Sequence, residues 1–154
     1  MATYYKCNAA EQARFGFTDK IIITYADLSG TAATTKTITL APFTAGLGVT
    51  KAAFKLVTAF DGTSTTNLAL DVGWNGASTD DPDGVLDNYE IHNDATEVVY
   101  GDGNGAAFAT LRTGYYPADA GNYEALFTAT GANLTDLTTG EVHIYLRLED
   151  LTKI

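Results

Sequence analysis

Hydrophobic and polar residues alternate strictly along residues 141–148, EVHIYLRL. One set of alternate positions is apolar and consists of Val142, Ile144, Leu146 and Leu148. The other set is mainly polar and consists of Glu141, His143, Tyr145 and Arg147. Because successive side chains of a β-strand point to opposite faces, this pattern predicts a half-buried strand. One face belongs to a core, and the other meets solvent or a partner.

Seven further segments share this strand-like character, being short, alternating or rich in β-branched residues. They are residues 20–25, 35–40, 51–60, 67–72, 96–100, 106–112 and 123–130. Gly, Asn, Asp and Pro separate them, and the best helical candidate is a single turn at residues 85–91. About eight strands of this kind predict an all-β fold, an antiparallel β-sandwich of jelly-roll type. The spacing Asp119-x-Gly121-x-Tyr123 matches the tyrosine corner of immunoglobulin-type sandwiches and supports a sandwich in general.

The length of 154 residues predicts one domain. Residues 1–18 are interpreted as an N-terminal arm, and residues 19–154 as the sandwich. The arm carries Tyr4, Tyr5, Phe15 and Phe17 without helix or strand periodicity. Ordering such a segment costs about 1–2 kcal/mol per residue in backbone entropy. We therefore expect these four aromatic side chains to bury themselves on a neighbouring subunit.

The charge of the chain is strongly acidic, with 19 acids, nine bases and a net charge of −10. Ten of the acids and none of the bases lie between Leu56 and Leu111. This balance argues against nucleic acid and against an anionic membrane as partners, since both bind through Lys and Arg. The N-terminus has no signal-peptide pattern, and no apolar run reaches 18 residues. We therefore expect a chain made in a cytoplasm, with no membrane partner.

The stretch STDDPDGVLDNYE at residues 78–90 partly matches the twelve-residue calcium loop of EF-hands. With Gly84 at position six, Asp81, Asp83 and Glu90 fall at positions three, five and twelve, but Thr79 occupies position one. A strand rather than a helix precedes the stretch, which argues against an EF-hand. We interpret it as an acidic connection between strands. Calcium remains possible as the one cofactor, with Asp81, Asp83, Asp87 and Glu90 as its candidate ligands.

Sequence motifs for catalysis are missing. Cys7 is the only cysteine, so no disulfide can form within the chain, and Cys7, His92 and His143 are too few for a typical zinc site. The glycines at 101, 103 and 105 lack the Lys-Ser/Thr of a phosphate-binding loop, and no Gly-x-Ser-x-Gly or His-Glu-x-x-His occurs. We expect no enzyme activity. Hydrolysis by paired acids, and sugar binding on Trp74 and the tyrosines, stay open as alternatives.

Three blocks resemble the small virion structural proteins of tailed bacteriophages. They are AAFKLVTAFDGTSTTNLALDVG (52–73), TDDPDGVLDNYEI (79–91) and ATGANLTDLTTGEVHIYLRLEDL (129–151). Within them, the turns Asp61-Gly62 and Asp81-Pro82-Asp83 and the strand start Thr139-Gly140-Glu141-Val142 carry the resemblance. The resemblance implies a capsid decoration or cement protein that binds the major capsid protein on the outer surface of the head. It also implies a homotrimer.

The expected contacts follow from this resemblance. The acidic middle of the chain suits an outward face that stays soluble, and the remainder is free to bind. On the last strand, His143, Tyr145 and Arg147 mix charge with one aromatic ring, as subunit contacts do. Together with the four aromatic residues of the arm, they form the predicted capsid or oligomer interface. The alternative function is a tail, baseplate or fibre subunit, with carbohydrate binding as one role.

Overall fold

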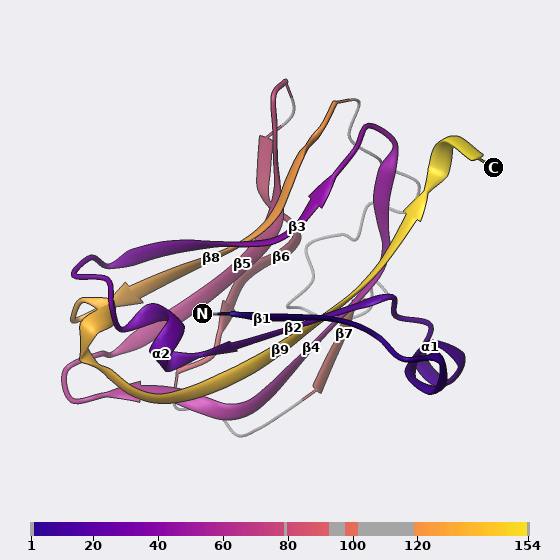
Figure 1. Ribbon diagram of the computed structural model, residues 1–154. Coiled ribbons are helices and arrows are strands. Elements are labelled where there is room, and N and C mark those ends of the chain that lie inside the picture. The colour runs from indigo at the N-terminus through magenta and orange to yellow at the C-terminus, as the bar shows by residue number, and fades with distance from the viewer. Residues whose placement is uncertain (1, 79, 93–97, 102–118, 154) are drawn as a thin grey trace.

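Two antiparallel β-sheets make up most of the protein. The computed structural model describes residues 2–78, 80–92, 98–101 and 119–153. Sheet A has the strand order β1-β2-β9-β4-β7, and sheet B has the order β3-β8-β5-β6. The two sheets form the layers visible in Figure 1. The prediction of an all-β fold is therefore confirmed.

The described strands and helices have the following bounds. Sheet A consists of β1 (Thr3–Lys6), β2 (Asp19–Thr24), β4 (Leu47–Gly62), β7 (Val98–Gly101) and β9 (Leu137–Asp150). Sheet B consists of β3 (Thr35–Phe43), β5 (Asn67–Gly76), β6 (Asp80–Glu90) and β8 (Gly121–Thr130). The helices are α1 (Ala9–Phe15), α2 (Tyr25–Leu28) and the 3₁₀ turns η1 (Leu134–Asp136) and η2 (Leu151–Lys153). Among the residues that the structure describes, no helix has the length and apolar character to cross a membrane.

The hydrophobic core lies between the two sheets and is built from alternate residues of each strand. On β9, Val142, Ile144 and Leu146 are fully buried, while His143 and Tyr145 lie on the opposite face. The core also buries the rings of Phe54 on β4 and Phe127 on β8. Each such side chain contributes about 1.5–3 kcal/mol by its removal from water. The face assignment predicted for residues 141–148 is thus confirmed.

The N-terminal segment forms a short strand and a short helix, although its sequence shows neither strand nor helix periodicity. β1 pairs antiparallel with β2 and forms an edge of sheet A. The helix α1 owes its formation to its caps rather than to hydrophobic periodicity. Asn8 and Glu11 form a reciprocal capping box, and Gly16 ends the helix with φ 74°. Caps and a four-residue edge strand leave little periodic signal in a sequence.

The acidic stretch is also extended, so the predicted helical turn at residues 85–91 is wrong. β6 pairs with β5, but its register shifts twice along the pair. Extra residues at these irregularities break the two-residue alternation, which is why the sequence pattern does not reveal a strand. Gly73 permits the close approach, because a Cβ there would lie 1.9 Å from the carbonyl oxygen of Asp81. The predicted strand at residues 106–112 lies outside the described residues, and β7 overlaps the one predicted at 96–100.

Candidate functional site

The outer face of sheet A, which points away from the core, carries a continuous set of side chains from four strands. Antiparallel register places Tyr5, Lys20, Tyr145 and Ala53 in one row across β1, β2, β9 and β4. Directly paired residues share a face, so these side chains are neighbours. A second row holds Ile22, His143 and Lys55, and on the other side of the first row Arg147 pairs with Lys51. These residues are called the outer face of sheet A below.

A small hydrophobic cluster sits on this outer face, separate from the main core. It consists of Cys7, Phe17 and Ala53, all buried, with the half-buried Tyr145 packed against them. The rings of Phe17 and Tyr145 have centroids 5.6 Å apart. The cluster therefore unites residues that the sequence placed in two separate groups, the N-terminal aromatics and the last strand.

Phe17 does not belong to an exposed interface, which corrects its predicted role. Its side chain is only 4% exposed, and it is buried by its own chain rather than by a neighbour. Burial also raises the pKa of the Cys7 thiol, and the nearby carboxylates of Glu11 and Asp19 add to that rise. The thiol is thus protonated at neutral pH and behaves as part of the apolar cluster.

A pocket opens beside this cluster, between α1 and the sheet. Its volume is about 270 Å³, and its lining residues are Cys7, Glu11, Phe15, Phe17, Ala53, Lys55 and Tyr145. The wall is mostly apolar, with the ammonium of Lys55 as a cationic group. A pocket of this kind suits one aromatic or branched aliphatic side chain flanked by negative charge.

The helix beside the pocket is linked to β4 at its C-terminal end and to Cys7, which precedes it. No residue of α1 is buried, and Phe15 is 42% exposed. Lys51 Nζ donates to the carbonyl oxygen of Phe15 at 2.7 Å, and Gln12 Nε2 donates to that of Cys7 at 2.6 Å. Figure 1 shows α1 standing out from the body of the sandwich. The helix thus offers apolar side chains that its own chain does not cover.

Positive charge concentrates on the outer face of sheet A. Its bases are Lys20, Lys51, Lys55 and Arg147, and the acids of β9 on the same face are Glu141 and Glu149. Lys20 Nζ lies 5.6 Å from the ring centroid of Tyr145, and Lys51 Nζ lies 4.8 Å from that of Phe17. These cation–π contacts hold the ammonium groups next to the pocket wall.

The pKa of His143 is lowered on this face. Burial lowers its pKa, and although a hydrogen bond with Glu141 opposes this, the charges of Lys20 and Lys55 reinforce the lowering. His143 Nε2 lies 2.6 Å from Glu141 Oε1, and the hydroxyl of Tyr145 lies 3.5 Å from His143 Nδ1. The imidazole of His143 is thus held between the Glu141 carboxylate and the Tyr145 hydroxyl.

The remaining residues of the predicted interface divide between two faces. Tyr4, 43% exposed, pairs with the core residue Ile21 and so points to the opposite side from Tyr5, which is 47% exposed. The Tyr4 hydroxyl donates to Asp19, a fully buried carboxylate that also accepts from Lys6 and Thr18. The exposed Arg147 pairs with Glu149 at 2.7 Å. Tyr5, Phe15, His143, Tyr145 and Arg147 thus cluster on or beside the outer face of sheet A, but Tyr4 does not.

The outer face of sheet B is acidic instead. A groove of about 460 Å³ crosses it, and its walls include the carboxylates of Asp71, Asp83 and Asp87. Burial raises the pKa of Asp71, and the charges of Asp87 and Asp83 add to the rise, although an amide hydrogen bond from Asn88 opposes it. Lys36 is the only base in the four strands of sheet B. It pairs with the core residue Phe127 and so lies on the other side.

The four candidate calcium ligands do not form a site in the described part of the chain. Asp81 pairs with Trp74 near one end of β6, and Glu90 pairs with Ala69 at the other end. An extended strand advances about 3.3 Å per residue, so the two carboxylates are far apart. Among the residues that the structure describes, no group of three or more acids, histidines or cysteines could hold a metal ion.

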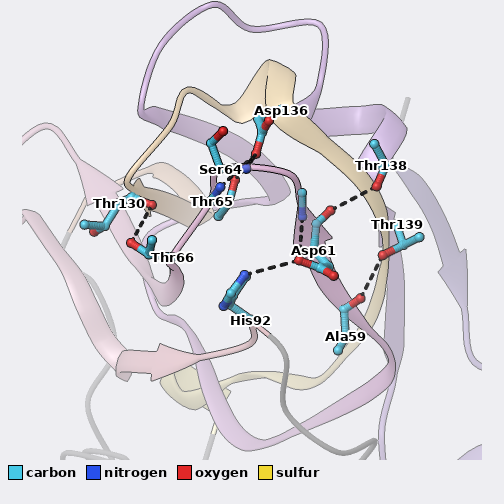
Figure 2. Close-up of polar contacts among 11 residues, drawn as sticks. Ala59, Asp61, Ser64, Thr65, Thr66, His92, Thr130, Asp136, Thr138 and Thr139 are labelled. Carbon is cyan, nitrogen blue, oxygen red and sulfur yellow. Dashed lines mark hydrogen bonds and ion pairs between the residues drawn. The ribbon is translucent and has the colours of Figure 1, made fainter.

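A polar cluster, separate from the outer face of sheet A, lies at the end of the sandwich where the chain passes from β4 to β5 (Figure 2). The carboxylate of Asp136 accepts hydrogen bonds from the amides of Ser64 and Thr65, both at 2.8 Å, and from the Thr65 hydroxyl at 2.9 Å. His92 Nε2 lies 3.4 Å from Asp61 Oδ1. Because Asp136 holds the Thr65 hydroxyl and both amides, the cluster anchors a turn. We assign it a structural role.

Several residues of the site escape a reading of the sequence. They are Cys7, Glu11, Lys20, Lys51, Ala53 and Lys55. The alternation of Lys51, Ala53 and Lys55 with buried neighbours does give a signal of one outward face. However, only the pairing of β4 with β9 shows that this face adjoins Tyr145. The alternative of a sugar platform on Trp74 is wrong, because the indole is 4% exposed and lies in the core.

Comparison of the chain with known proteins identifies no related protein. No protein-family model, curated protein or solved structure matches the chain. The function is therefore argued from the two oppositely charged faces, from the pocket beside α1 and from the sequence blocks described above.

Proposed function

We propose that the protein is a nonenzymatic virion structural protein of a tailed bacteriophage. In this proposal it decorates the head as a cement protein and binds the major capsid protein through the outer face of sheet A. Sheet B then faces outward, at the outer surface of the virion. The protein is made in the host cytoplasm before it joins the head.

The observation that carries the proposal is the separation of charge between the two sheets. Lys20, Lys51, Lys55 and Arg147 lie on sheet A beside the exposed Phe15. The opposite sheet carries Asp71, Asp83, Asp87 and Glu124. A protein bound to a large surface needs one face that adheres and another that repels its neighbours and stays hydrated. The mixed basic and aromatic face has the composition of protein interfaces.

Support for the jelly-roll form of the sandwich comes from the strand order. In a jelly roll of eight strands, the first pairs with the last and the second with the last but one, which gives two four-stranded sheets. Without β1, the orders β2-β9-β4-β7 and β3-β8-β5-β6 follow that scheme. Jelly rolls occur in viral capsid proteins and in lectins, so the topology agrees with a virion role by analogy alone.

Separation of purified heads and tails tests the proposal. We expect mass spectrometry to find the protein in every head preparation and to find it depleted from tails. Purified heads that lack the protein should bind it when it is added back, and they should then resist heat or low salt better than bare heads. The resemblance also predicts a trimer, which light scattering of the free protein will measure. Presence in tails alone would contradict the proposal.

The second candidate is a tail, baseplate or fibre subunit that binds carbohydrate. The groove on sheet B favours it, because Asn67, Asp71, Asn88, Thr128 and Thr130 line it with groups that can hydrogen-bond sugar hydroxyls. A glycan array tests this role directly. A signal that Asp71→Ala removes, together with presence in tails, would favour this candidate over decoration.

A further inference from the structure

We infer that the pocket beside α1 receives an aromatic or branched aliphatic side chain carried by an acidic segment of the partner protein. This inference rests on the proposed function, since it names the chemistry by which the outer face of sheet A recognises its partner. It assigns a specific role to Phe15 and Lys55, which no sequence motif marks.

The apolar part of the pocket is largely preformed. Phe17 is fixed by Cys7 and Ala53 beneath it and by the ring of Tyr145 at 5.6 Å. A volume of about 270 Å³ exceeds that of one aromatic side chain, so an anchor can enter without rearrangement of the sheet. Because the walls are already ordered, binding does not have to order them, and this preserves affinity.

The helix side of the pocket is only partly covered, with the Arg14 guanidinium 5.1 Å from the ring centroid of Phe15. A helix of seven residues is marginally stable by itself, and α1 buries none of its residues. Its C-terminal Phe15 is 42% exposed although the side chain lines the pocket. An inserted side chain would contact Phe15 from the open side and so complete the packing of the helix.

The charges around the pocket select the partner. Lys55 lines it, and Lys20 and Lys51 stand over the rings of Tyr145 and Phe17. The acid in the wall, Glu11, is engaged in the helix cap, where its Oε2 accepts from the amide of Asn8 at 2.9 Å. The ammonium groups therefore favour carboxylates on either side of the anchor.

A second copy of the chain fits the pocket less well than a different protein. The acidic outer face of sheet B supplies complementary charge but no anchor. The exposed large hydrophobic side chains of the described residues are Tyr4, Tyr5, Phe15 and Tyr25, all outside sheet B. From the described residues we therefore assign the partner segment to another chain, which the proposed function identifies as the major capsid protein.

Peptide binding to the full-length protein tests the inference. The probe is a fluorescein-labelled peptide Asp-Glu-Phe-Glu-Asp, measured by fluorescence anisotropy at 50 mM salt. We expect it to bind at least tenfold more tightly than Asp-Glu-Ser-Glu-Asp, which lacks the anchor, and than Lys-Lys-Phe-Lys-Lys, which reverses the charge. Binding should weaken at 500 mM salt because exposed charges are screened. Equal affinity for the three peptides would overturn the inference.

Two pairs of variants locate the binding. Phe15→Ala and Lys55→Glu should each lower the affinity for the acidic peptide at least tenfold. Tyr25→Ala removes a ring of similar exposure, 38%, that does not line the pocket, and Lys153→Glu makes the same charge change elsewhere. Both controls should bind within twofold of the unmodified protein. Melting temperatures of all four variants will show that they are folded, and unchanged binding by Phe15→Ala and Lys55→Glu would overturn the inference.

The same variants, added to heads that lack the protein, separate this inference from the proposed function. Loss of head binding in Phe15→Ala and Lys55→Glu, together with displacement of the unmodified protein by excess acidic peptide, supports both. Normal head binding by these variants overturns the pocket inference and leaves the decoration role intact. If the unmodified protein binds the acidic peptide but does not bind heads, the pocket inference stands and the decoration role is overturned. If the unmodified protein self-associates and Lys55→Glu abolishes this self-association, the pocket binds a second copy of the chain. That result would overturn the assignment of the major capsid protein as partner.

Discussion

The hydroxyl of Tyr123 donates a hydrogen bond to the carbonyl oxygen of Leu47 at 2.9 Å and thereby links the two sheets. Tyr123 lies on β8 of sheet B, and Leu47 begins β4 of sheet A. The Tyr123 ring is 2% exposed and packs on Phe43 with centroids 4.8 Å apart. The tyrosine-corner spacing supported a sandwich in general. The acceptor of this tyrosine lies on a strand of the other sheet, so the hydrogen bond joins the two layers.

Tyr123→Phe should remove this link while preserving the ring packing. The expected loss is about 1 kcal/mol in the free energy of unfolding, a typical net value for one hydrogen bond. Urea denaturation of the variant and of the unmodified protein measures it. Tyr123→Ala serves as the comparison and should cost about 3–5 kcal/mol, because it also removes the buried ring. Equal stability of Tyr123→Phe and the unmodified protein would show that the bond contributes nothing.

Leu146→Ala and Arg147→Ala test the two faces of β9. Leu146 is fully buried, so its truncation leaves a cavity and should cost about 2–5 kcal/mol. Arg147 is exposed and forms one surface ion pair, so its truncation should cost about 0–1 kcal/mol. Melting temperature and occupancy on heads are measured together. We expect Leu146→Ala to lower the melting temperature and Arg147→Ala to lower only the occupancy on heads. An unchanged melting temperature for Leu146→Ala together with a large drop for Arg147→Ala would contradict the face assignment.

Phe17→Ala tests whether the N-terminal segment belongs to the folded domain. Phe17 is buried against Ala53, so its truncation should destabilise the protein by about 3 kcal/mol. Tyr5→Ala is the matched control, because Tyr5 is 47% exposed, and it should change stability by about 0.5 kcal/mol or less. Deletion of residues 1–17 should therefore destabilise the domain as well as weaken head binding. Full stability of the truncated protein would restore the interpretation as a detachable arm.

Asp136→Asn should change how stability depends on pH. Hydrogen bonds to the carboxylate from the amide of Ser64 and from the amide and hydroxyl of Thr65 hold the pKa of Asp136 below its ordinary value. A carboxyl whose folded-state pKa is lowered stabilises the protein above its unfolded pKa, about 3.9, and this contribution is lost as pH falls toward the folded pKa. Melting curves should show a large difference between variant and unmodified protein at pH 6 and a small one at pH 2.5. A constant difference would mean that the charge of Asp136 is not involved.

Gly84→Ala tests the packing of the acidic strand on the core. A Cβ at Gly84 would lie 2.4 Å from the ring of Trp74, which is buried and cannot move freely. The overpacking should cost about 1–3 kcal/mol and shift the tryptophan fluorescence. Gly30→Ala is the control, since a Cβ there meets no atom within 4 Å. Similar melting temperatures for both variants would contradict the close approach of β6 to Trp74.

Local alternation in the sequence determined which faces of the regular strands are buried. Residues 141–148, 123–130 and 51–60 each show this pattern, and the structure places strands at all three. The all-β class follows from it, because side-chain direction along a strand depends only on positions two residues apart. The charge asymmetry was equally visible, since a count of residues suffices to find it.

Tertiary structure alone decided which of these faces meet. The pairing of β2 and β4 with β9 places Lys20 and Ala53 beside Tyr145, and the turn after α1 brings Phe17 onto them. The shifts in register along β6 likewise depend on the close approach of β5, so its sequence resembled a turn. Strand pairing is a contact between residues distant along the chain, and periodicity contains no information about it. The pocket beside α1 therefore exists only in the folded protein, where three segments without a shared motif form one surface.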